Sequence, residues 1–545
     1  MLSISIKYKD KKYVYPKGTS LLEISKDFQS EFQDKIIISI VDGAITELGT
    51  NLFSNATVDF YDKNSEIGNK VYEAGLLFIL IKSFKDLYNE KIKISHSIDK
   101  GIYIQSNKTI TEKVLDEVKN KMEEMIKANL SIDKLLINRK EAIKYYQKIK
   151  EFDKVELLKY NTNTNINLYK LDNTYDYFFN PLPVSTSYIK EFKINMIDKD
   201  SFVISYPSLY TSKINYKHHE KLFDAFNDYY DFSSKLGIKS ICDLNKKVTE
   251  GTINDYVFLS ETYQNNKLLK IAEDISNNKN IKLVLISGPS SSGKTTTSKK
   301  LQLFLKGFGI NPKTLSIDDY FVDREKTPKK EDGSYDFESI NAIKLDLFNR
   351  DLTKLLKGEK VKLPTYNFIL GKGEYIDEAT SLEENEILII EGLHALNNEL
   401  TSSIDKKNKY KIYLSPLTVL NLDDHNRIRT TEVRLLRRIV RDNRTRGYKA
   451  KDVLNTWLSV REGEEKNVFP YQDEADVIFN TTLLYEVGVL KTYAEPLLFA
   501  VDEKEEHYKE AVRLLNLLKN ILAIPSDCIP KDSILREFIG DGYFI

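Results

Sequence analysis

Apolar and polar residues alternate through the first sixty residues in the way typical of β-strands. The alternation over residues 4–15, interrupted by a polar turn, predicts a hairpin. Ser20 is placed to cap a short apolar helix, and residues 35–41 and 58–61 read as further strands. We therefore expect a small β-rich unit over residues 1–62.

In the next two hundred residues, the apolar positions recur mainly at helical spacing. Residues 63–195 combine predicted helices with short strands, and residues 196–280 form a mostly helical connecting segment. The predicted helices and the last strand cover residues 69–89, 111–129, 139–152 and 188–195. Aromatic residues recur at helical spacing in the connecting segment, at Phe223, Phe226, Tyr229 and Tyr230, and this stripe is expected to pack into a core.

From residue 281 the pattern changes again, to continuous apolar strands separated by helices. The first strand is 281–287, and the later strands cover residues 314–317, 387–390, 411–414 and 477–479. Strands that are apolar on both faces and alternate with helices indicate a parallel α/β sheet. The chain is thus predicted to be multidomain α/β, with the parallel-sheet unit over 281–500 and a helical tail over 501–545.

The amino-acid composition excludes several classes of protein. With 81 basic and 81 acidic residues, the formal net charge is zero, so any binding site for polyanions must be local. Two cysteines, Cys242 and Cys528, exclude a disulfide scaffold and suit a reducing compartment. The longest apolar run, Ala74 to Ile81, is far shorter than the ~20 residues that span a membrane. The N-terminus also lacks the apolar core of a signal peptide. We therefore expect a cytoplasmic protein without a membrane partner.

The clearest chemical motif follows the strand at 281–287. It reads GPSSSGKTT and fits the pattern G-x-x-x-x-G-K-S/T between a strand and a helix. Backbone N–H groups of such a loop cradle phosphates, Lys294 would contact the outer phosphates, and Thr295 would ligate Mg²⁺. The predicted ATP-binding residues are Gly288, Pro289, Ser290, Ser291, Ser292, Gly293, Lys294, Thr295 and Thr296.

Two later strands end in carboxylates. Asp318 and Asp319 follow the strand at 314–317, and Glu391 ends the strand at 387–390. Parallel sheets place their active sites at the carboxyl ends of strands. An acid there can accept a proton from an attacking hydroxyl or hold Mg²⁺. The alternative is that these acids only cap a helix or end a turn.

A group of arginines is the strongest companion signal. Arg434, Arg437, Arg438 and Arg441 share one face of a predicted helix, with apolar residues opposite. Aligned cations repel one another unless anions or acids lie against them. Triphosphate oxygens would do so, and a flexible arginine-bearing lid would exclude water during phosphoryl transfer. Nucleic-acid binding by this face stays open as an alternative.

Together these motifs resemble the uridine kinase/phosphoribulokinase family over roughly residues 281–500. The resemblance rests on GPSSSGKTT, SIDDYF, YDFESINAIKLDLF, LPTYNF, ILIIEG and RRIVRDNRTRGY. It implies Asp318 as general base, with Lys294, Arg438 and Arg441 as further catalytic residues. It also implies that Thr295 and Glu391 hold Mg²⁺. Substrate binding would fall to Glu338, Tyr366, Arg437 and Arg446.

The chain departs from that family at the substrate end. Uridine kinases carry a His and then an Arg shortly after the motif that contains Tyr366. Those positions fall here on Gly371 and Gly373, with Lys372 between them. The acid expected to contact ribose is Glu338, where the family has Asp.

The N-terminal half resembles the front of a threonyl-tRNA synthetase. YPKGTSLLEI in residues 1–62 is similar to a TGS domain of β-grasp fold, and HSIDKGIYI and EAIKYYQ are similar to the second, α+β domain that edits mischarged tRNA. The polar pairs of that editing site align with Tyr72 and Leu76, and with Phe178 and Leu182. Because zinc and water-placing groups need polar donors, the alignment predicts no editing hydrolysis and no catalytic zinc. We also expect the fragment 1–195 to be a stable module.

The resemblance implies an ATP- and Mg²⁺-dependent kinase that phosphorylates the 5′-hydroxyl of a nucleoside, with uridine as the first candidate. Two alternatives stay open: a kinase for another hydroxylated metabolite, and a tRNA-sensing regulatory ATPase. The N-terminal domains would then contact RNA or nucleotide, and self-association is compatible with either reading.

Overall fold

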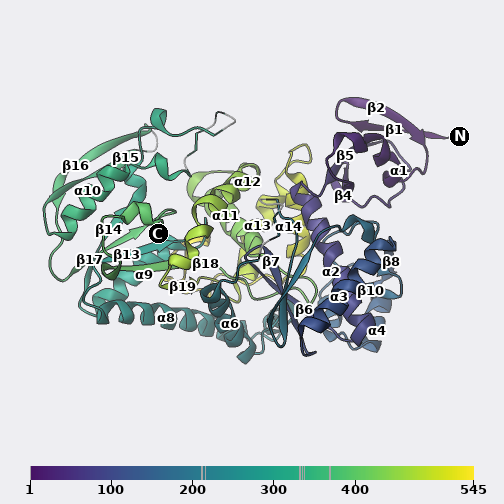
Figure 1. Cartoon of the computed structure of the whole chain (residues 1–545), viewed down its shortest axis with the longest axis horizontal. Coiled ribbons are helices and arrows are strands. Elements are labelled where there is room, and N and C mark those ends of the chain that lie inside the picture. The colour runs from purple at the N-terminus through teal and green to yellow at the C-terminus, as the bar shows by residue number, and fades with distance from the viewer. Residues whose placement is uncertain are drawn as a thin grey trace.

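A computed structural model describes residues 2–209, 213–214, 216–330, 333, 335–336, 338–367 and 370–544. Figure 1 shows the small N-terminal sheet and the helices around α2 at one end of the molecule and the parallel sheet at the other. Among the described helices, none is long and apolar enough to cross a membrane.

The first unit is a five-stranded sheet with one short helix packed on it. The strand order is β2-β1-β5-β3-β4, with β1 and β5 parallel. The elements are β1 Ser3–Tyr8, β2 Lys11–Pro16, α1 Leu21–Ser25, β3 Ile36–Val41, β4 Ala44–Thr46 and β5 Ala56–Asp62. Ser20 caps α1, since its Oγ accepts a hydrogen bond from the Glu23 N–H at 3.1 Å. The predicted hairpin, the cap and both later strands are confirmed.

The second unit is built around a helix buried on all sides. Helix α2, Glu66–Tyr88, is buried around its whole circumference, and most of its buried residues are apolar, which is why it lies inside the unit rather than on its surface. The sheets have the orders β11-β12-β7-β6 and β10-β9-β8. Their strands are β6 Ile92–Ile98, β7 Gly101–Ser106, β8 Ile132–Asn138, β9 Asn165–Leu171, β10 Thr174–Asp176, β11 Lys193–Asp198 and β12 Ser201–Ser205.

Two of the helical predictions in this unit have different outcomes. The helix expected over 111–129 is α3, Glu112–Lys127, capped by Thr111. The helix expected over 139–152 is instead two helices, α4 Arg139–Lys148 and α5 Phe152–Lys159. Lys150 between them has a φ of 61°, a left-handed conformation that a continuous helix cannot contain.

Three helices connect this unit to the parallel sheet. They are α6 Glu220–Lys235, α7 Ile241–Thr249 and α8 Ile253–Asn277. The aromatic stripe of α6 packs as predicted, with Phe226 and Tyr229 buried in the core that the connecting helices share with the parallel sheet. The connecting helices are therefore part of the wall of that unit.

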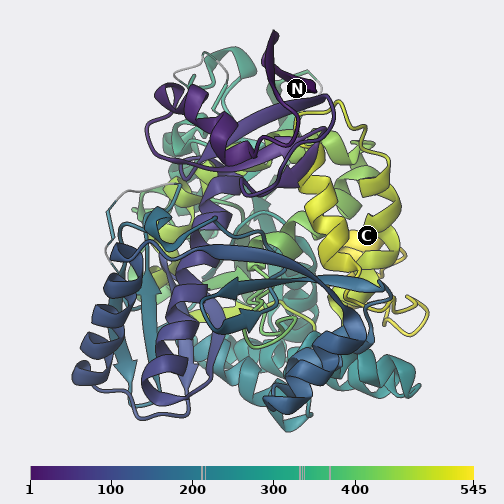
Figure 2. The same ribbon diagram turned by 90° about the vertical axis from the view of Figure 1, so that its right-hand side faces the viewer.

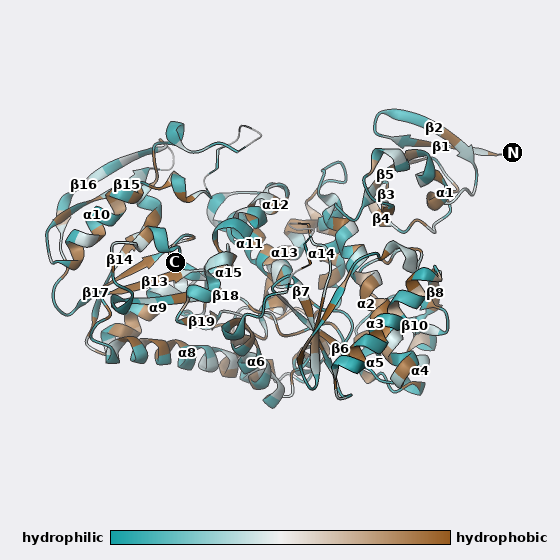
Figure 3. Cartoon of the chain, viewed as in Figure 1, coloured by the Kyte–Doolittle hydropathy of each residue, from teal (hydrophilic) through white to brown (hydrophobic). Residues whose placement is uncertain are grey.

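The C-terminal sheet has the order β14-β17-β13-β18-β19, and every neighbouring pair is parallel. Its strands are β13 Leu283–Ser287, β14 Asn311–Ser316, β17 Glu386–Glu391, β18 Lys409–Ser415 and β19 Val477–Asn480. Figure 3 shows strands of this sheet as hydrophobic between more polar helices. The covering helices are α9 Lys294–Gly307, α10 Leu345–Leu356, α11 Thr430–Arg446, α12 Ala450–Asn467 and α13 Glu486–Phe499. The predicted parallel α/β fold is confirmed.

Two parts of this half were not predicted in detail. A hairpin, β15 Val361–Asn367 and β16 Lys372–Thr380, projects beside β14. The C-terminal tail contains α14 Tyr508–Leu518 and the single turn α15 Arg536–Ile539, and both pack into the core of the parallel-sheet unit. In Figure 2 the yellow C-terminal helices lie beside the purple N-terminal sheet, and Lys509 Nζ lies 3.0 Å from Tyr61 Oη.

Buried ion pairs join the second unit to the parallel-sheet unit. Lys154 is fully buried between Asp176, at 2.8 Å, and Asp423, at 3.3 Å, which belong to different units. Glu73 of α2 likewise binds Arg427 and Arg429 just before α11. Separating such a pair would leave a buried charge without a partner, which is strongly destabilising. The ion pairs therefore fix the two units relative to each other.

Candidate active site

The phosphate-binding motif forms the loop between β13 and α9, at the carboxyl edge of the sheet. Two glycines are required by its shape. A Cβ at Gly288 would lie 2.3 Å from the Leu414 carbonyl oxygen, and Gly293 has a φ of +86°. The backbone N–H groups of Gly293, Lys294 and Thr295 have no hydrogen-bond acceptor among the described residues. The loop therefore presents a set of free donors at a helix N-terminus, as an anion site does.

Lys294 closes the loop on itself. Its ammonium group donates to the carbonyl oxygens of Gly288, at 2.9 Å, and Pro289, at 3.1 Å. Burial lowers the pKa of Lys294, and the nearby carboxylates of Glu391 and Glu537 act in the opposite direction. A phosphate group at the loop would supply the negative charge that desolvated Lys294 needs.

Thr295 and Glu391 are brought together from neighbouring strands. The Thr295 hydroxyl donates to Glu391 Oε1 at 3.2 Å. Burial raises the pKa of Glu391, and the charge of Lys294 acts in the opposite direction. A hydroxyl beside a carboxylate is the oxygen donor set that Mg²⁺ prefers, so the residues present fit that ion.

Asp318 and Asp319 follow β14 and take different roles. In the sheet Ser316 lies opposite Glu391, so Asp318 emerges beside the metal-binding pair. Asp319 Oδ1 accepts hydrogen bonds from the Tyr366 N–H, at 3.2 Å, and the Thr365 hydroxyl. Asp318 remains open to solvent, yet enough protein surrounds it for desolvation to raise its pKa, against the charge of Lys294. Asp318 is therefore the acid that can accept a proton.

The predicted substrate residues lie on two sides of this edge. Glu338 lies against α12, where a Cβ on Gly463 would be 3.0 Å from its Cγ, and burial raises its pKa while Arg438 lowers it. Tyr366 is nearly buried on β15, and its ring centroid lies 5.7 Å from that of Phe321. The structure thus brings Glu338 close to the arginine helix and holds Tyr366 beside the end of β14.

The glycine that replaces the family's histidine lies under an arginine. A Cβ on Gly371 would lie 2.8 Å from Arg324 Cβ, and Gly371 has a φ of +68°. The Arg324 N–H donates to the Gly371 carbonyl at 2.9 Å. A histidine could not replace Gly371 without moving this arginine.

The arginine helix α11 differs from the expected mobile lid. Arg434 and Arg437 are fully buried, and they form ion pairs with Glu464 and Glu486. Their guanidinium groups also donate to the loop carbonyls of Ser290, at 2.9 Å, and Ser291, at 3.3 Å. Acids rather than triphosphate oxygens therefore neutralise this pair, so α11 is a packed support of the loop and Arg437 is not placed to contact substrate.

Three of the four remaining arginines of α11 bind one carboxylate, that of Asp442. Arg438 donates to the Ser290 hydroxyl at 2.9 Å and pairs with Asp442. Arg441 also binds Asp442, at 2.8 Å, whereas Arg446 is about half exposed and 3.6 Å from the same carboxylate. The buried carboxylate of Asp442 thus binds all three, and of these Arg438 is in contact with the loop.

Two carboxylates at the loop were not predicted. Glu464 Oε1 accepts the Ser290 N–H at 2.7 Å, and Glu537 Oε2 accepts the Thr296 N–H at 3.1 Å. Both come from segments more than 150 residues after the loop, so no local pattern indicated them. Glu537 lies in the tail predicted over 501–545, where no sequence motif predicted a site residue.

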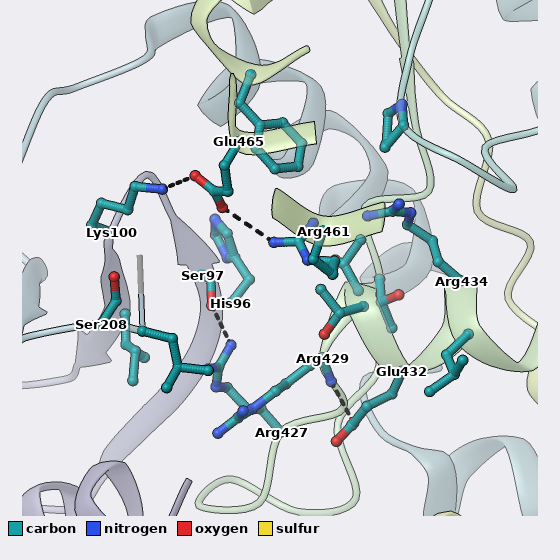
Figure 4. A pocket seen from close by; sticks show the side chains of 18 of the residues that line it. His96, Ser97, Lys100, Ser208, Arg427, Arg429, Glu432, Arg434, Arg461 and Glu465 are labelled. Atoms are coloured by element: carbon teal, nitrogen blue, oxygen red, sulfur yellow. Dashed lines mark hydrogen bonds and ion pairs between the residues drawn. The ribbon is translucent and has the colours of Figure 1, made fainter. Parts of the chain in front are cut away.

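A cavity of about 300 Å³ lies behind the loop, between the second unit and the parallel-sheet unit (Figure 4). Pro289 and Arg434 line it, but the catalytic candidates Lys294, Thr295 and Asp318 do not. Its other cations are paired with acids: Lys100 with Glu465, Arg461 with Glu465, and Arg429 with Glu73. The cavity is thus a charged but balanced space between the units and not the phosphate site.

The positions aligned with the synthetase editing site form a packed interior. Tyr72, Leu76, Phe178 and Leu182 are all buried. The Tyr72 hydroxyl is already satisfied: it donates to the Glu191 carbonyl at 2.9 Å and accepts the N–H groups of Lys190 and Glu191. The residues that would bind zinc and water in an editing site are therefore replaced by packed side chains.

Comparisons with known proteins match two parts of the chain. Residues 283–486 match the model of the phosphoribulokinase/uridine kinase family. A uridine kinase of Staphylococcus epidermidis is 28% identical over 198 residues, which cover 36% of this chain and 86% of that kinase. The solved structure of a possible uridine kinase from Bacillus stearothermophilus is 18% identical, with a TM-score of 0.25, over 37% of this chain and 89% of that one.

A second set of relatives is of another kind. A threonine–tRNA ligase of Clostridium kluyveri is 29% identical over 198 residues, or 36% of this chain. The chain spans about a third of the length of that ligase, 31%. Residues 283–486 are thus similar to the phosphoribulokinase/uridine kinase family, in a chain that is also similar to part of the threonine–tRNA ligases.

Proposed function

We propose that this chain transfers the γ-phosphoryl group of ATP to the 5′-hydroxyl of a nucleoside, with uridine as the first acceptor to test. The observation that carries the proposal is the meeting of three groups at one sheet edge. These are the free N–H donors of the loop, the Thr295–Glu391 pair and the solvent-accessible Asp318. Phosphoryl transfer needs little else than positioning, charge stabilisation and a proton acceptor.

Each group has one task in this scheme. The loop N–H groups and Lys294 bind the phosphates, and Lys294 releases its two loop carbonyls to do so. Thr295 and Glu391 would hold Mg²⁺, which neutralises charge on the phosphates when bound. Asp318 accepts the proton of the attacking hydroxyl, and its raised pKa makes it a better base.

Charge stabilisation divides between two arginine sets. Arg438 reaches the loop serine and is available to the transferred phosphoryl group, with Arg441 and Arg446 behind it. Arg434 and Arg437 act indirectly, because they fix the loop carbonyls that define its curvature. Glu338 and Tyr366 would bind the sugar and the rest of the acceptor.

The acceptor could also be another hydroxylated metabolite, and one observation favours keeping this second candidate. The place of the family's pyrimidine-reading histidine is Gly371, covered by Arg324. The proposal also includes the division of the chain into the five predicted ranges, 1–62, 63–195, 196–280, 281–500 and 501–545. It further includes a contact of the N-terminal units with RNA or nucleotide. The test is turnover of ATP with a panel of nucleosides and sugars, with the phosphorylated product identified by mass.

A further inference from the structure

The C-terminal segment 526–544 packs directly on the phosphate loop, although it lies outside the family-matched region. Ile534, Leu535 and Phe538 are fully buried. A Cβ on Gly293 would lie only 2.6 Å from Ile534 Cγ2, so the segment touches the loop backbone itself. Phe538 lies under the guanidinium of Arg437, 4.9 Å from ring centroid to Cζ.

Polar contacts fix the segment in the same place. Arg444 of α11 donates to the carbonyl oxygens of Glu537, at 3.0 Å, and Phe538, at 3.2 Å. Lys300 of α9 binds the Asp532 carboxylate at 2.8 Å. Figure 3 shows α15 beside α11 accordingly. With Ile534, Leu535 and Phe538 buried and its backbone bound by Arg444, the segment forms one wall of the site.

One side chain of this wall enters the phosphate site. Glu537 is only partly buried, and its Oε2 accepts the backbone N–H of Thr296 at 3.1 Å. Thr296 lies in the first turn of α9, where N–H groups point toward a bound anion. In loops of this pattern these N–H groups cradle the α- and β-phosphates of a nucleotide. The carboxylate therefore occupies a donor that a nucleotide phosphate requires.

Electrostatics at the loop make the two anions exclusive. Glu537 faces Lys294 and adds to the negative charge felt by Glu391. A triphosphate brought beside these carboxylates would be repelled by Glu537 unless its side chain turned away. The backbone of Glu537 is held by Arg444, which donates to its carbonyl oxygen at 3.0 Å, so the movement would be one of the side chain.

We propose that Glu537 belongs to the nucleotide site and holds the place of a nucleotide phosphate while the site is empty. ATP binds after the Glu537 side chain has left the Thr296 N–H. The apparent affinity for ATP is therefore the intrinsic affinity multiplied by the fraction of molecules in which this N–H is free. The inference rests on the proposed function, since it requires that the loop binds a nucleotide. It adds a residue outside the kinase domain that sets how tightly the nucleotide is bound.

The test measures the dissociation constant of a non-hydrolysable ATP analogue with Mg²⁺ on the full chain by calorimetry. Glu537→Ala frees the donor and removes the charge, so we expect binding about tenfold tighter, the effect of one charge-assisted hydrogen bond. Glu537→Gln keeps an acceptor without the charge and should lie between wild type and Glu537→Ala. Asp527→Ala removes the same charge from an exposed position of the same segment and serves as the matched control.

The outcomes separate this inference from the proposed function. Equal or weaker binding by Glu537→Ala, with binding by the wild type measurable and lost in Lys294→Ala, would overturn the inference alone. Tighter binding in Asp527→Ala to the same degree would also overturn it, as a mere effect of net charge. If neither the wild type nor Glu537→Ala binds the analogue, the proposed nucleotide site is wrong and the inference fails with it.

Discussion

Asp319 accepts the backbone N–H of Tyr366 at 3.2 Å, and this contact ties the end of β14 to the β15–β16 hairpin. The neighbouring Asp318 has no such donor among the described residues. The two adjacent acids therefore have different tasks. Asp319 holds together the part of the site that would bind the phosphoryl acceptor, and Asp318 is left as a base.

Asp318→Asn should reduce turnover by ~10²–10⁴-fold, because it removes the proton acceptor and preserves the shape. ATP affinity and thermal stability should change little. Asp319→Ala should instead lower stability by about 1–3 kcal/mol, since it leaves the Tyr366 N–H without its acceptor. Steady-state kinetics and urea unfolding of both variants check this. A mild Asp318→Asn beside an inactive, stable Asp319→Ala would reverse the assignment.

Lys294→Ala should lower ATP turnover at least ~10²-fold, because a cation that stabilises developing charge is removed. The fold should persist, with a small loss of stability from the two loop carbonyls that Lys294 binds. Lys306→Ala, an exposed lysine near the end of the same helix, is the control. Turnover within threefold of wild type in folded Lys294→Ala would contradict the role of the loop.

Arg437→Met should destabilise the protein by about 3–5 kcal/mol, because Glu486 is left buried without its partner. The double variant Arg437→Met/Glu486→Leu should recover most of this loss, since no charge is then left buried. Urea unfolding measures both. If Arg437→Met is stable but inactive, Arg437 contacts substrate after all, as the sequence had suggested.

His219 should make stability depend on pH. Its ring lies 3.7 Å from Asp99 and 2.7 Å from Asp473, which belong to different units, and these two carboxylates raise its pKa, Asp99 more than Asp473. Since the folded pKa exceeds the unfolded value of about 6.5, this stabilisation is complete below that pH and lost as pH rises through the folded pKa.

The variant His219→Gln isolates that effect. Wild type should be more stable than His219→Gln by about 1–3 kcal/mol below about pH 6, and the difference should shrink as the pH rises through the folded pKa. His218→Gln, at the exposed neighbouring position, should show no such trend. A difference that grows with pH would show that the imidazole is neutral in the folded protein.

The full chain should neither deacylate seryl-tRNA charged on a threonine tRNA nor bind zinc stoichiometrically, because the aligned editing positions are packed side chains. Hydrolysis above the buffer rate, or one zinc per chain by elemental analysis, would contradict this. The full chain is used because, in the fragment 1–195, Lys154 loses Asp423 and Glu73 loses Arg427 and Arg429. The earlier expectation of a stable fragment does not fit this interface.

Local patterns predicted the fold well wherever an element depends on its own residues. The alternation over 4–15, the Ser20 cap and the apolar strand at 281–287 carry their structure in their periodicity. The break in the helix at Lys150 was missed because a left-handed residue leaves no mark in hydropathy.

The site residues also divide into those that a local motif predicts and those that depend on distant partners. Lys294, Thr295 and Asp318 belong to motifs whose spacing reflects their chemistry. The partners of α11 do not: Glu464 and Glu486 are distant acids, and only the packed structure shows that they, not a triphosphate, bind Arg434 and Arg437. Glu537 was missed for the same reason, since nothing near it in the chain refers to the loop.

The most direct test of the account is ATP turnover with Mg²⁺ on the full chain, with each nucleoside and sugar of a panel, read by product mass. We expect ADP formed in equal amount with a nucleoside 5′-monophosphate, UMP first, and loss of both products in Lys294→Ala and Asp318→Asn. ATP hydrolysis that RNA stimulates, without a phosphorylated small molecule from any acceptor, would contradict it.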